Sequence, residues 1–517
     1  MPILGTILKK GIKLRETLEQ DFTAPYDLQK QELSQLLISA RNTQIGREYD
    51  FVSVLEEFRN NDPHQFFEKF KEQVIACDYD KIDEKWWRKM RAGEPDVVWP
   101  GKTKFFALSS GTSGSSSKYI PISKDMIKAI RKTGTRHMYT LSKYELTDKF
   151  FQCGMLMLGG STQLNFSGNY HYGDLSGITT GQLPMWIQGF SRPGPKIAKN
   201  RDWATKLEEI VENAPKWNIG MIAGVPAWMQ ILVEKIIERY NVDNIHEIWP
   251  NLQAFVHGGV AFDPYKKGFD RLLGQPIHYI DTYLASEGFM AFQSEPNKKS
   301  MRLVLNNGIF YEFVPFNEKN FDADGELVDF PETLMIDQIE EGKEYALLIS
   351  TCSGAWRYLI GDTIKFVDKR NSEIIITGRT KHFLSLCGEH LSVDNMNKAM
   401  EAVAEVLDIS IKEFTVAGIP DGTLFSHQWY VGCDDEIDPD TLMYAVDEKL
   451  KELNDDYAVE RQHALKNVKM NVLPTVVFYE WLRSEGKEGG QSKFPRVLKK
   501  EKLERWHEFL AKEASIN

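Results

Sequence analysis

A run of nine residues made only of serine, glycine and threonine occupies positions 109–117. The mostly apolar segment 104–108 precedes this run, and Lys118 follows it at the start of a second apolar segment. Glycines let a backbone curl and present N–H groups to an anion, hydroxyl groups add donors, and a lysine adds positive charge. The segment therefore predicts a loop that binds a polyphosphate.

This loop differs from the Walker phosphate loop. The G-x-x-x-x-G-K-[ST] spacing is absent, and the residues after Lys118 read as a strand where a Walker loop would continue into a helix. A flexible linker rich in serine and glycine is the alternative interpretation. We favour the phosphate loop because a linker seldom lies between two closely spaced strands.

Two later segments carry groups that suit a nucleotide. Gly258 and Gly259 end an apolar run, which is a weak indication that the backbone approaches a ligand closely. Further along, Tyr283 offers a face for stacking, Ser286 is a small polar neighbour, and Glu287 offers a carboxylate for Mg²⁺. A purely structural turn is the alternative interpretation for this second segment.

The remaining candidates lie in three short segments near charged residues. Arg357 precedes Gly361-Asp362, and a carboxylate can accept hydrogen bonds from two adjacent hydroxyl groups, although an ordinary turn has the same composition. Arg379 lies in a charged segment that would also suit a solvated loop. Lys493 lies in a segment that begins with two glycines, where a lone lysine is usually a surface residue.

The order of these motifs resembles a known superfamily. The segment 109–114 is similar to the phosphate loop of the acyl-adenylate-forming enzymes, which include acyl-CoA ligases and firefly luciferase. The longer run from Gly93 through Trp99 to Pro121 resembles one branch, the auxin-responsive Gretchen Hagen family of acyl acid–amido synthetases. The resemblance extends to Arg496, with the motifs in the expected order, and is loose in the N-terminal part and the final helix.

The resemblance implies a role for each motif. Tyr283 would lie against adenine, Glu287 would help to hold Mg²⁺, and Asp362 would accept hydrogen bonds from the ribose. The family's Gln-x-Lys-x-Pro-Arg signature makes Lys493 the candidate catalytic lysine. Leu359 stands where plant members usually carry a second arginine, so no charged role is assigned there. The expected ATP contacts are Ser109, Ser110, Gly111, Thr112, Ser113, Gly114, Lys118, Gly258, Gly259, Tyr283, Ser286, Glu287, Arg357, Asp362 and Arg379.

The reaction implied by the resemblance uses ATP and Mg²⁺ to activate a carboxylic acid as its acyl-adenylate. An amine, by resemblance an amino acid, would then accept the acyl group to form an amide, with AMP and pyrophosphate as the other products. An acyl-CoA ligase remains an alternative, because a C-terminal basic cluster could form a docking surface for the phosphates of CoA. The cluster consists of Lys493, Arg496, Lys499, Lys500 and Lys502. A non-catalytic ATP-binding protein is a second alternative, although such a protein would have no need of Lys493.

The overall composition excludes several other classes. The 517 residues allow two or three domains, and a net charge of -11 argues against a nucleic-acid partner. Five cysteines are scattered without a C-x-x-C pair, which favours reduced thiols in the cytoplasm. No signal peptide and no apolar stretch long enough to cross a membrane is found, so we expect a cytoplasmic protein without a membrane partner.

The pattern of apolar residues predicts an α/β fold. Helical periodicity at 29–40 and 63–77 indicates a helical N-terminal part. Short apolar runs then alternate with helical patterns, which is typical of a largely parallel sheet. The expected strands are 104–108, 151–158, 219–222, 254–256 and 276–280, and the expected helices between them are 203–213 and 227–240.

The chain is expected to divide into two domains. Residues 1–379 would form the large adenylate-forming domain, with closely spaced strands making a β-rich subdomain at about 302–379. Residues 380–517 would form a small, mobile α+β domain that carries Lys493, and Gly378 and Gly388 suit a chain that bends there. Its expected elements are helices at 393–406, 439–454 and 499–512 and strands at 414–419, 428–433 and 472–478.

Overall fold

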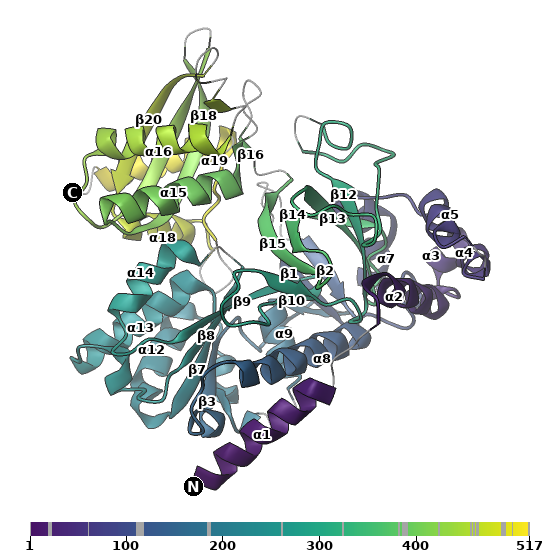
Figure 1. Ribbon diagram of the computed structural model, residues 1–517, viewed down its shortest axis with the longest axis horizontal. Coiled ribbons are helices and arrows are strands. Elements are labelled where there is room, and N and C mark those ends of the chain that lie inside the picture. Colours follow the sequence, from purple (N-terminus) through teal and green to yellow (C-terminus); the bar gives the residue numbers. More distant parts are fainter. Residues whose placement is uncertain are drawn as a thin grey trace.

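The protein has a large lobe, residues up to 380, and a small lobe, residues 391–514, which lies above it in green and yellow (Figure 1). The computed structural model describes residues 2–18, 23–59, 62–109, 118–183, 188–259, 262–322, 325–380, 383–384, 391–421, 424–454, 457–458, 461, 465–487, 493–498 and 500–514. In this part of the chain, no helix is long and apolar enough to cross a membrane.

A mixed sheet runs through the large lobe and has eleven strands among the described residues. Its five strands from β9 to β6 are parallel, as the sequence predicts, and the strands from β9 to β12 are antiparallel. The expected β-rich subdomain therefore continues the same sheet. In spatial order the strands are β12 (Ile309–Pro315), β13 (Glu344–Thr351), β14 (Tyr358–Asp368), β15 (Glu373–Arg379), β11 (Met301–Leu303), β10 (Gly288–Phe292), β9 (His278–Ala285), β8 (Ala254–Gly258), β7 (Ile219–Gly224), β3 (Gly154–Leu158) and β6 (Ser191–Arg192).

Helices cover both halves of this sheet. Gln29, on the helix predicted at 29–40, is buried and bonds the backbone of Leu305, Ile309 and Tyr311, which fixes that helix to β12. The described helices of the large lobe are α1 (Pro2–Leu18), α2 (Pro25–Ala40), α3 (Gln44–Glu48), α4 (Phe51–Glu57), α5 (Gln65–Gln73), α6 (Tyr79–Ile82), α7 (Arg88–Arg91), α8 (Lys124–Thr140), α9 (Leu175–Gly181), α11 (Pro195–Ala198), α12 (Trp203–Asn213), α13 (Pro226–Tyr240) and α14 (Asp263–Arg271).

A second, four-stranded sheet carries the ends of the predicted phosphate loop. Its order is β2 (Lys118–Ile122), β1 (Phe105–Ser109), β5 (His171–Gly173) and β4 (Asn165–Phe166). Strands β1 and β2 are antiparallel, and Ser109 is the register partner of Lys118. The two residues that flank the loop therefore lie side by side.

The small lobe is a three-stranded sheet between two pairs of helices. Alternate residues of one strand face opposite sides: Val416 packs with the first helix pair and Ala417 with the second. This is the period-2 pattern of a sheet buried on both faces. The strands are β18 (Ile411–Asp421), β19 (Leu424–Cys433) and β20 (Leu465–Leu473), and the helices are α15 (Val393–Leu407) and α16 (Pro439–Leu453) on one side and α18 (Thr475–Ser484) and α19 (Lys500–Ala514) on the other.

One predicted element of the small lobe is wrong. The strand expected at 472–478 ends at Leu473, and helix α18 begins at Thr475. Pro474 is the residue before the helix, where a missing backbone N–H is tolerated. Phe478, Trp481 and Leu482 then recur at helical spacing and are buried against the sheet. The apolar run thus belongs to an amphipathic helix.

Candidate active site between the two lobes

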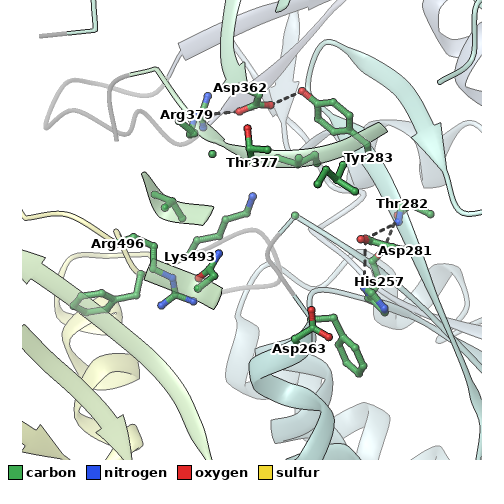
Figure 2. A pocket seen from close by; sticks show the side chains of 18 of the residues that line it. His257, Asp263, Asp281, Thr282, Tyr283, Asp362, Thr377, Arg379, Lys493 and Arg496 are labelled. Carbon is green, nitrogen blue, oxygen red and sulfur yellow. Dashed lines mark hydrogen bonds and ion pairs between the residues drawn. The ribbon is translucent and has the colours of Figure 1, made fainter. Parts of the chain in front are cut away.

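A cleft of about 1060 Å³ lies between the lobes (Figure 2). Its large-lobe wall is formed by the ends of β8, β9, β14 and β15, and its small-lobe wall by α15 and the segment 493–496. Ligand sites in α/β proteins commonly lie beyond the carboxyl ends of parallel strands. Here the parallel strands β8 and β9 end at the cleft. The predicted site residues that line it are Ser109, Lys118, Gly259, Tyr283, Ser286, Glu287, Asp362, Arg379 and Lys493.

The predicted phosphate loop is represented by its two ends. Ser109 and Lys118 both line the cleft, and the Lys118 ammonium lies 5.2 Å from the centre of the Tyr79 ring. The two described residues that border the predicted loop therefore both lie at the cleft. The other expected loop contacts, Ser110, Gly111, Thr112, Ser113 and Gly114, lie outside the described residues.

Three predicted residues form one group, joined by a hydrogen bond and an ion pair. The Tyr283 hydroxyl on β9 donates to Asp362 Oδ2 at 2.6 Å, and Arg379 Nε lies 3.1 Å from Asp362 Oδ1 (Figure 2). Asp362 and Arg379 are register partners on β14 and β15, which explains why segments distant from Tyr283 in sequence meet it here. Burial and the Asp362 carboxylate hold the pKa of Tyr283 well above its ordinary value, so the phenol remains a donor.

Glu287 is a buried carboxylate without an ion-pair partner among the described contacts. It lies in the turn that joins β9 to β10, and only 7% of its surface is exposed. Burial, helped by the charge of Asp362, raises its pKa to about 7, while Lys118 and Arg379 act in the opposite direction. Such a group gains from a nearby cation, which would replace the water that burial removes.

Lys493 enters the cleft from the small lobe, on the side where Tyr283, Asp362 and Arg379 lie (Figure 2). Its side chain is still accessible to solvent, but the walls of the cleft and the charge of Arg379 lower its pKa to about 8, and Asp362 opposes this change. Gly259 makes room for this lysine. A methyl group on Gly259 would lie 3.2 Å from Cε and 3.3 Å from Nζ of Lys493.

The two predicted glycines have different surroundings. Gly259 has a φ of +86°, a conformation that favours glycine, and lines the cleft. Gly258 instead packs against the neighbouring strand: a Cβ there would lie 2.4 Å from the carbonyl oxygen of Thr282. The sequence indicated that the backbone at Gly258 approaches a ligand closely. In the structure, its close neighbour is the backbone of strand β9.

The structure does not bring Arg357 to the cleft. Its guanidinium is buried beside Glu312, which is 0% exposed, and Arg357 Nη2 lies 2.9 Å from a Glu312 carboxylate oxygen. Further hydrogen bonds reach the carbonyl oxygen of Val74 and the hydroxyl of Thr333. Arg357 thus joins the N-terminal helical part to the antiparallel half of the sheet, and we withdraw it as an expected ATP contact.

Several residues at the cleft, or in the lobe interface beside it, were not predicted as a group. His257 and Asp281 face each other on β8 and β9, with His257 Nδ1 3.5 Å from Asp281 Oδ1. Tyr265 of the large lobe meets Glu413 of the small lobe, and Glu413 also binds Arg496. Only strand register and lobe packing place these side chains together, so no local motif could have indicated the contacts.

The overall fold is similar to that of two solved structures. The solved structure "GH3.15 acyl acid amido synthetase" superposes with a TM-score of 0.74 at 16% identity, covering 97% of this chain and 96% of that chain. "2-Hydroxyisobutyryl-CoA Ligase (HCL) in the postadenylation state in complex with R3-HIB-AMP" superposes with a TM-score of 0.59 at 11% identity, covering 93% and 91%. At these identities the likeness concerns the fold alone.

Matches along the sequence identify the branch. Residues 14–163 match the GH3 family N-terminal domain, 302–376 the central domain and 394–502 the C-terminal domain. The chain therefore belongs to the GH3 family. "Indole-3-acetic acid-amido synthetase GH3.2" of Arabidopsis thaliana is 20% identical over 77% of this chain and 82% of that protein. The match to "Indole-3-acetic acid-amido synthetase GH3.4" of Arabidopsis thaliana reaches 26% identity but covers 41% of this chain and only 36% of that protein.

Proposed function

We propose that this GH3 family protein activates a carboxylic acid with ATP and Mg²⁺ and transfers the acyl group to an amine, forming an amide. The observation that carries this proposal is the meeting of Lys493, from one lobe, with the Tyr283–Asp362–Arg379 group and Glu287 of the other. This arrangement collects positive charge, a buried carboxylate and an aromatic face in one cleft. Adenylation of an acid needs these three kinds of group.

The described residues fit ATP. Tyr283 would lie beside the base, Asp362 would accept hydrogen bonds from the ribose, and Arg379 would help to hold that carboxylate in place. Ser109 and Lys118 would bring the loop between them onto the phosphates, where backbone N–H groups and hydroxyls suit an anion. We further propose that the boundary between the two domains lies near Thr380, directly after β15.

The described residues also fit a single Mg²⁺ ion. No group of three acidic, histidine or cysteine side chains gathers in the part of the chain that the structure describes. Mg²⁺ commonly uses only one or two carboxylates and completes its shell with phosphates and water. Glu287 would supply the protein ligand, and the ion would neutralise charge on the phosphates.

Lys493 would offset the repulsion between the two anionic reactants. A carboxylate must approach the α-phosphate of ATP, and negative charge grows there in the transition state. The long, flexible ammonium of Lys493 can reach that point from the small lobe. Its pKa of about 8 keeps most of the population charged at neutral pH.

The acceptor is proposed to be an amino acid. The relatives named above are amido synthetases, and "Jasmonoyl--L-amino acid synthetase JAR4" of Nicotiana attenuata is 27% identical over 33% of this chain. The acid is proposed to be a small aryl or aliphatic acid.

A cytoplasmic location is part of the same proposal, because Cys77, Cys153, Cys352 and Cys433 are all free thiols.

Acid-dependent release of pyrophosphate tests this function. Purified protein would receive ATP, Mg²⁺ and one acid from a panel of indole-3-acetic, benzoic and octanoic acids and 2,4-DB. We expect release with at least one acid, and a loss of about 10²–10³-fold in Lys493→Ala, because one transition-state charge contact is removed. Lys469→Ala, an exposed lysine of the same lobe, is the matched control.

Parallel reactions with amino acids or CoA identify the acceptor. Formation of an amide with an amino acid would support the proposal, whereas a thioester with CoA would replace it with an acyl-CoA ligase. ATP binding without pyrophosphate release from any acid in the panel would contradict the enzymatic assignment.

A further inference from the structure

A buried hydrogen bond joins the two lobes. The hydroxyl of Tyr265, on α14 of the large lobe, donates to Glu413 Oε1, on β18 of the small lobe. Tyr265 is 1% exposed and Glu413 is 4% exposed, so little water competes for this bond. A hydrogen bond to a charged acceptor in such surroundings is stronger than one between neutral groups.

The other oxygen of Glu413 holds Arg496. Arg496 Nη1 donates to Glu413 Oε2 at 2.7 Å and to the carbonyl oxygen of Phe414 at 3.0 Å. The guanidinium also lies 4.3 Å from the centre of the Phe414 ring. Glu413 therefore binds the large lobe through one oxygen and the segment of Lys493 through the other.

The backbone around Arg496 is fixed to the same strand. Val416 N donates to Arg496 O at 3.0 Å, and Leu498 N donates to Val416 O at 2.8 Å, so the segment adds to β18 like a short parallel strand. Lys493 precedes Arg496 by three residues and projects past Gly259 of the large lobe. The position of Lys493 is thus coupled through Arg496 and Glu413 to Tyr265.

Other contacts between the lobes are weaker. Lys267 lies 3.4 Å from Asp408, and Lys299 lies 3.4 Å from Glu401. Lys267 and Lys299 have exposed side chains, and Asp408 is almost fully exposed, so these ion pairs contribute little. Of the polar contacts between the lobes described above, the Tyr265–Glu413 hydrogen bond is the one whose two side chains are both buried.

We propose that Tyr265, Glu413 and Arg496 are positioning residues that hold the lobes in the arrangement where Lys493 reaches the reacting phosphate. This inference rests on the proposed function. The first half-reaction, adenylation, needs Lys493 in the cleft. In the proposed scheme the second half-reaction, attack by the amine, proceeds without this lysine and requires access to the cleft. Weakening the contact should therefore slow the first step selectively.

Tyr265→Phe removes one hydroxyl and tests this directly. A matched control exists within the small lobe, where the buried Tyr457 hydroxyl donates to Asp447 at 2.6 Å and Arg461 binds the same carboxylate at 2.7 Å. Tyr457→Phe thus removes the same kind of bond without crossing the interface. Thermal unfolding of both variants would show that each one folds, and Glu413→Gln provides a second change of the same contact.

Two rates would be compared, using whichever of indole-3-acetic, benzoic and octanoic acids and 2,4-DB supports the fastest reaction. The first rate is acid-dependent exchange of pyrophosphate into ATP. The second is single-turnover amide formation from enzyme loaded with its acyl-adenylate. We expect Tyr265→Phe to lower the exchange rate by about tenfold, the equivalent of about 1.4 kcal/mol, and to leave the second rate unchanged or faster.

Four results would be decisive. An unchanged exchange rate in Tyr265→Phe would overturn the inference. Equal losses in both half-reactions, or the same loss in Tyr457→Phe, would also overturn it, because they indicate a general effect on the fold. Absence of exchange in the wild-type protein with every acid would instead count against the proposed function, and so the two failures are distinguishable.

Discussion

Lys493 of the small lobe lies against Gly259 of the large lobe, where a Cβ atom would approach Lys493 Cε to 3.2 Å. This contact predicts that Gly259→Ala shifts the end of the Lys493 side chain by a few tenths of an ångström. We expect the rate of acid-dependent pyrophosphate exchange to fall by about tenfold or more, with a stability loss of about 1–2 kcal/mol from the positive φ. Exchange kinetics and thermal unfolding would measure the two effects.

Gly258→Ala is the matched control for this change. Its Cβ would meet the backbone of Thr282, so this variant should lose stability through strain between β8 and β9. A Gly259→Ala variant with a wild-type exchange rate would contradict the predicted contact with Lys493.

Asp362 connects Tyr283 and Arg379, so it should matter for nucleotide affinity. Asp362→Asn keeps the shape but removes the charge, and we expect the Kd for ATP to rise about tenfold or more, since a hydrogen bond to a charged group contributes about 1.5–3 kcal/mol. Isothermal titration with ATP and Mg²⁺ would measure this change. Tyr283→Phe keeps the aromatic face and should have a smaller effect; wild-type affinity in Asp362→Asn would exclude the proposed role.

Local pattern and motif order predicted much of the molecule. Helices α15 and α16 lie within a residue of their expected limits, because buried residues recur along one face. The order of short motifs brought Tyr283, Glu287 and Asp362 into one expected site, and the structure places all three on the same cleft. The helix predictions are confirmed because local sequence determines which face of a helix is buried, whereas the roles of the three site residues stay predictions.

Long-range contacts could not be read in the same way. Arg357 lies close to Asp362 in sequence, yet its buried partner Glu312 is 45 residues away along the chain. Because the guanidinium binds Glu312, it does not line the cleft. Tyr265 and Glu413 are 148 residues apart and meet only because α14 packs on the small lobe. The partners of such side chains are decided by how lobes and strands pack together. The periodicity of apolar residues along the sequence carries no information about that packing.

The Arg357–Glu312 pair predicts a variant that loses stability and keeps its nucleotide site. Arg357→Met would leave the Glu312 carboxylate buried without its cation, at a cost of about 3–5 kcal/mol. The double variant with Glu312→Gln should recover part of that loss. Urea unfolding would give the stabilities, and titration at a temperature where both variants are folded should give an ATP affinity close to that of the wild type. A large loss of ATP affinity in the folded double variant would show that Arg357 does contribute to the nucleotide site.

Glu287 predicts how the metal-free protein responds to pH. Its pKa is about 7 in the folded protein, against an ordinary value of 4.5, so the folded state binds more protons than the unfolded state between these values. Stability from this group is therefore fully present below pH 4.5 and is lost as pH rises through 7, by about 3 kcal/mol in all. The cause is the buried carboxylate, which becomes charged without a cation beside it.

Glu287→Gln should remove this dependence. In EDTA, urea unfolding at pH 8 should find the variant more stable than the wild type, whereas at pH 5 the two should differ little. Mg²⁺ with ATP should stabilise the wild type most at pH 8, where the carboxylate is ionised, and should stabilise the variant less. Equal pH dependence in the two proteins would show that Glu287 is not the titrating group, and equal stabilisation by Mg²⁺ and ATP would exclude it as the metal ligand.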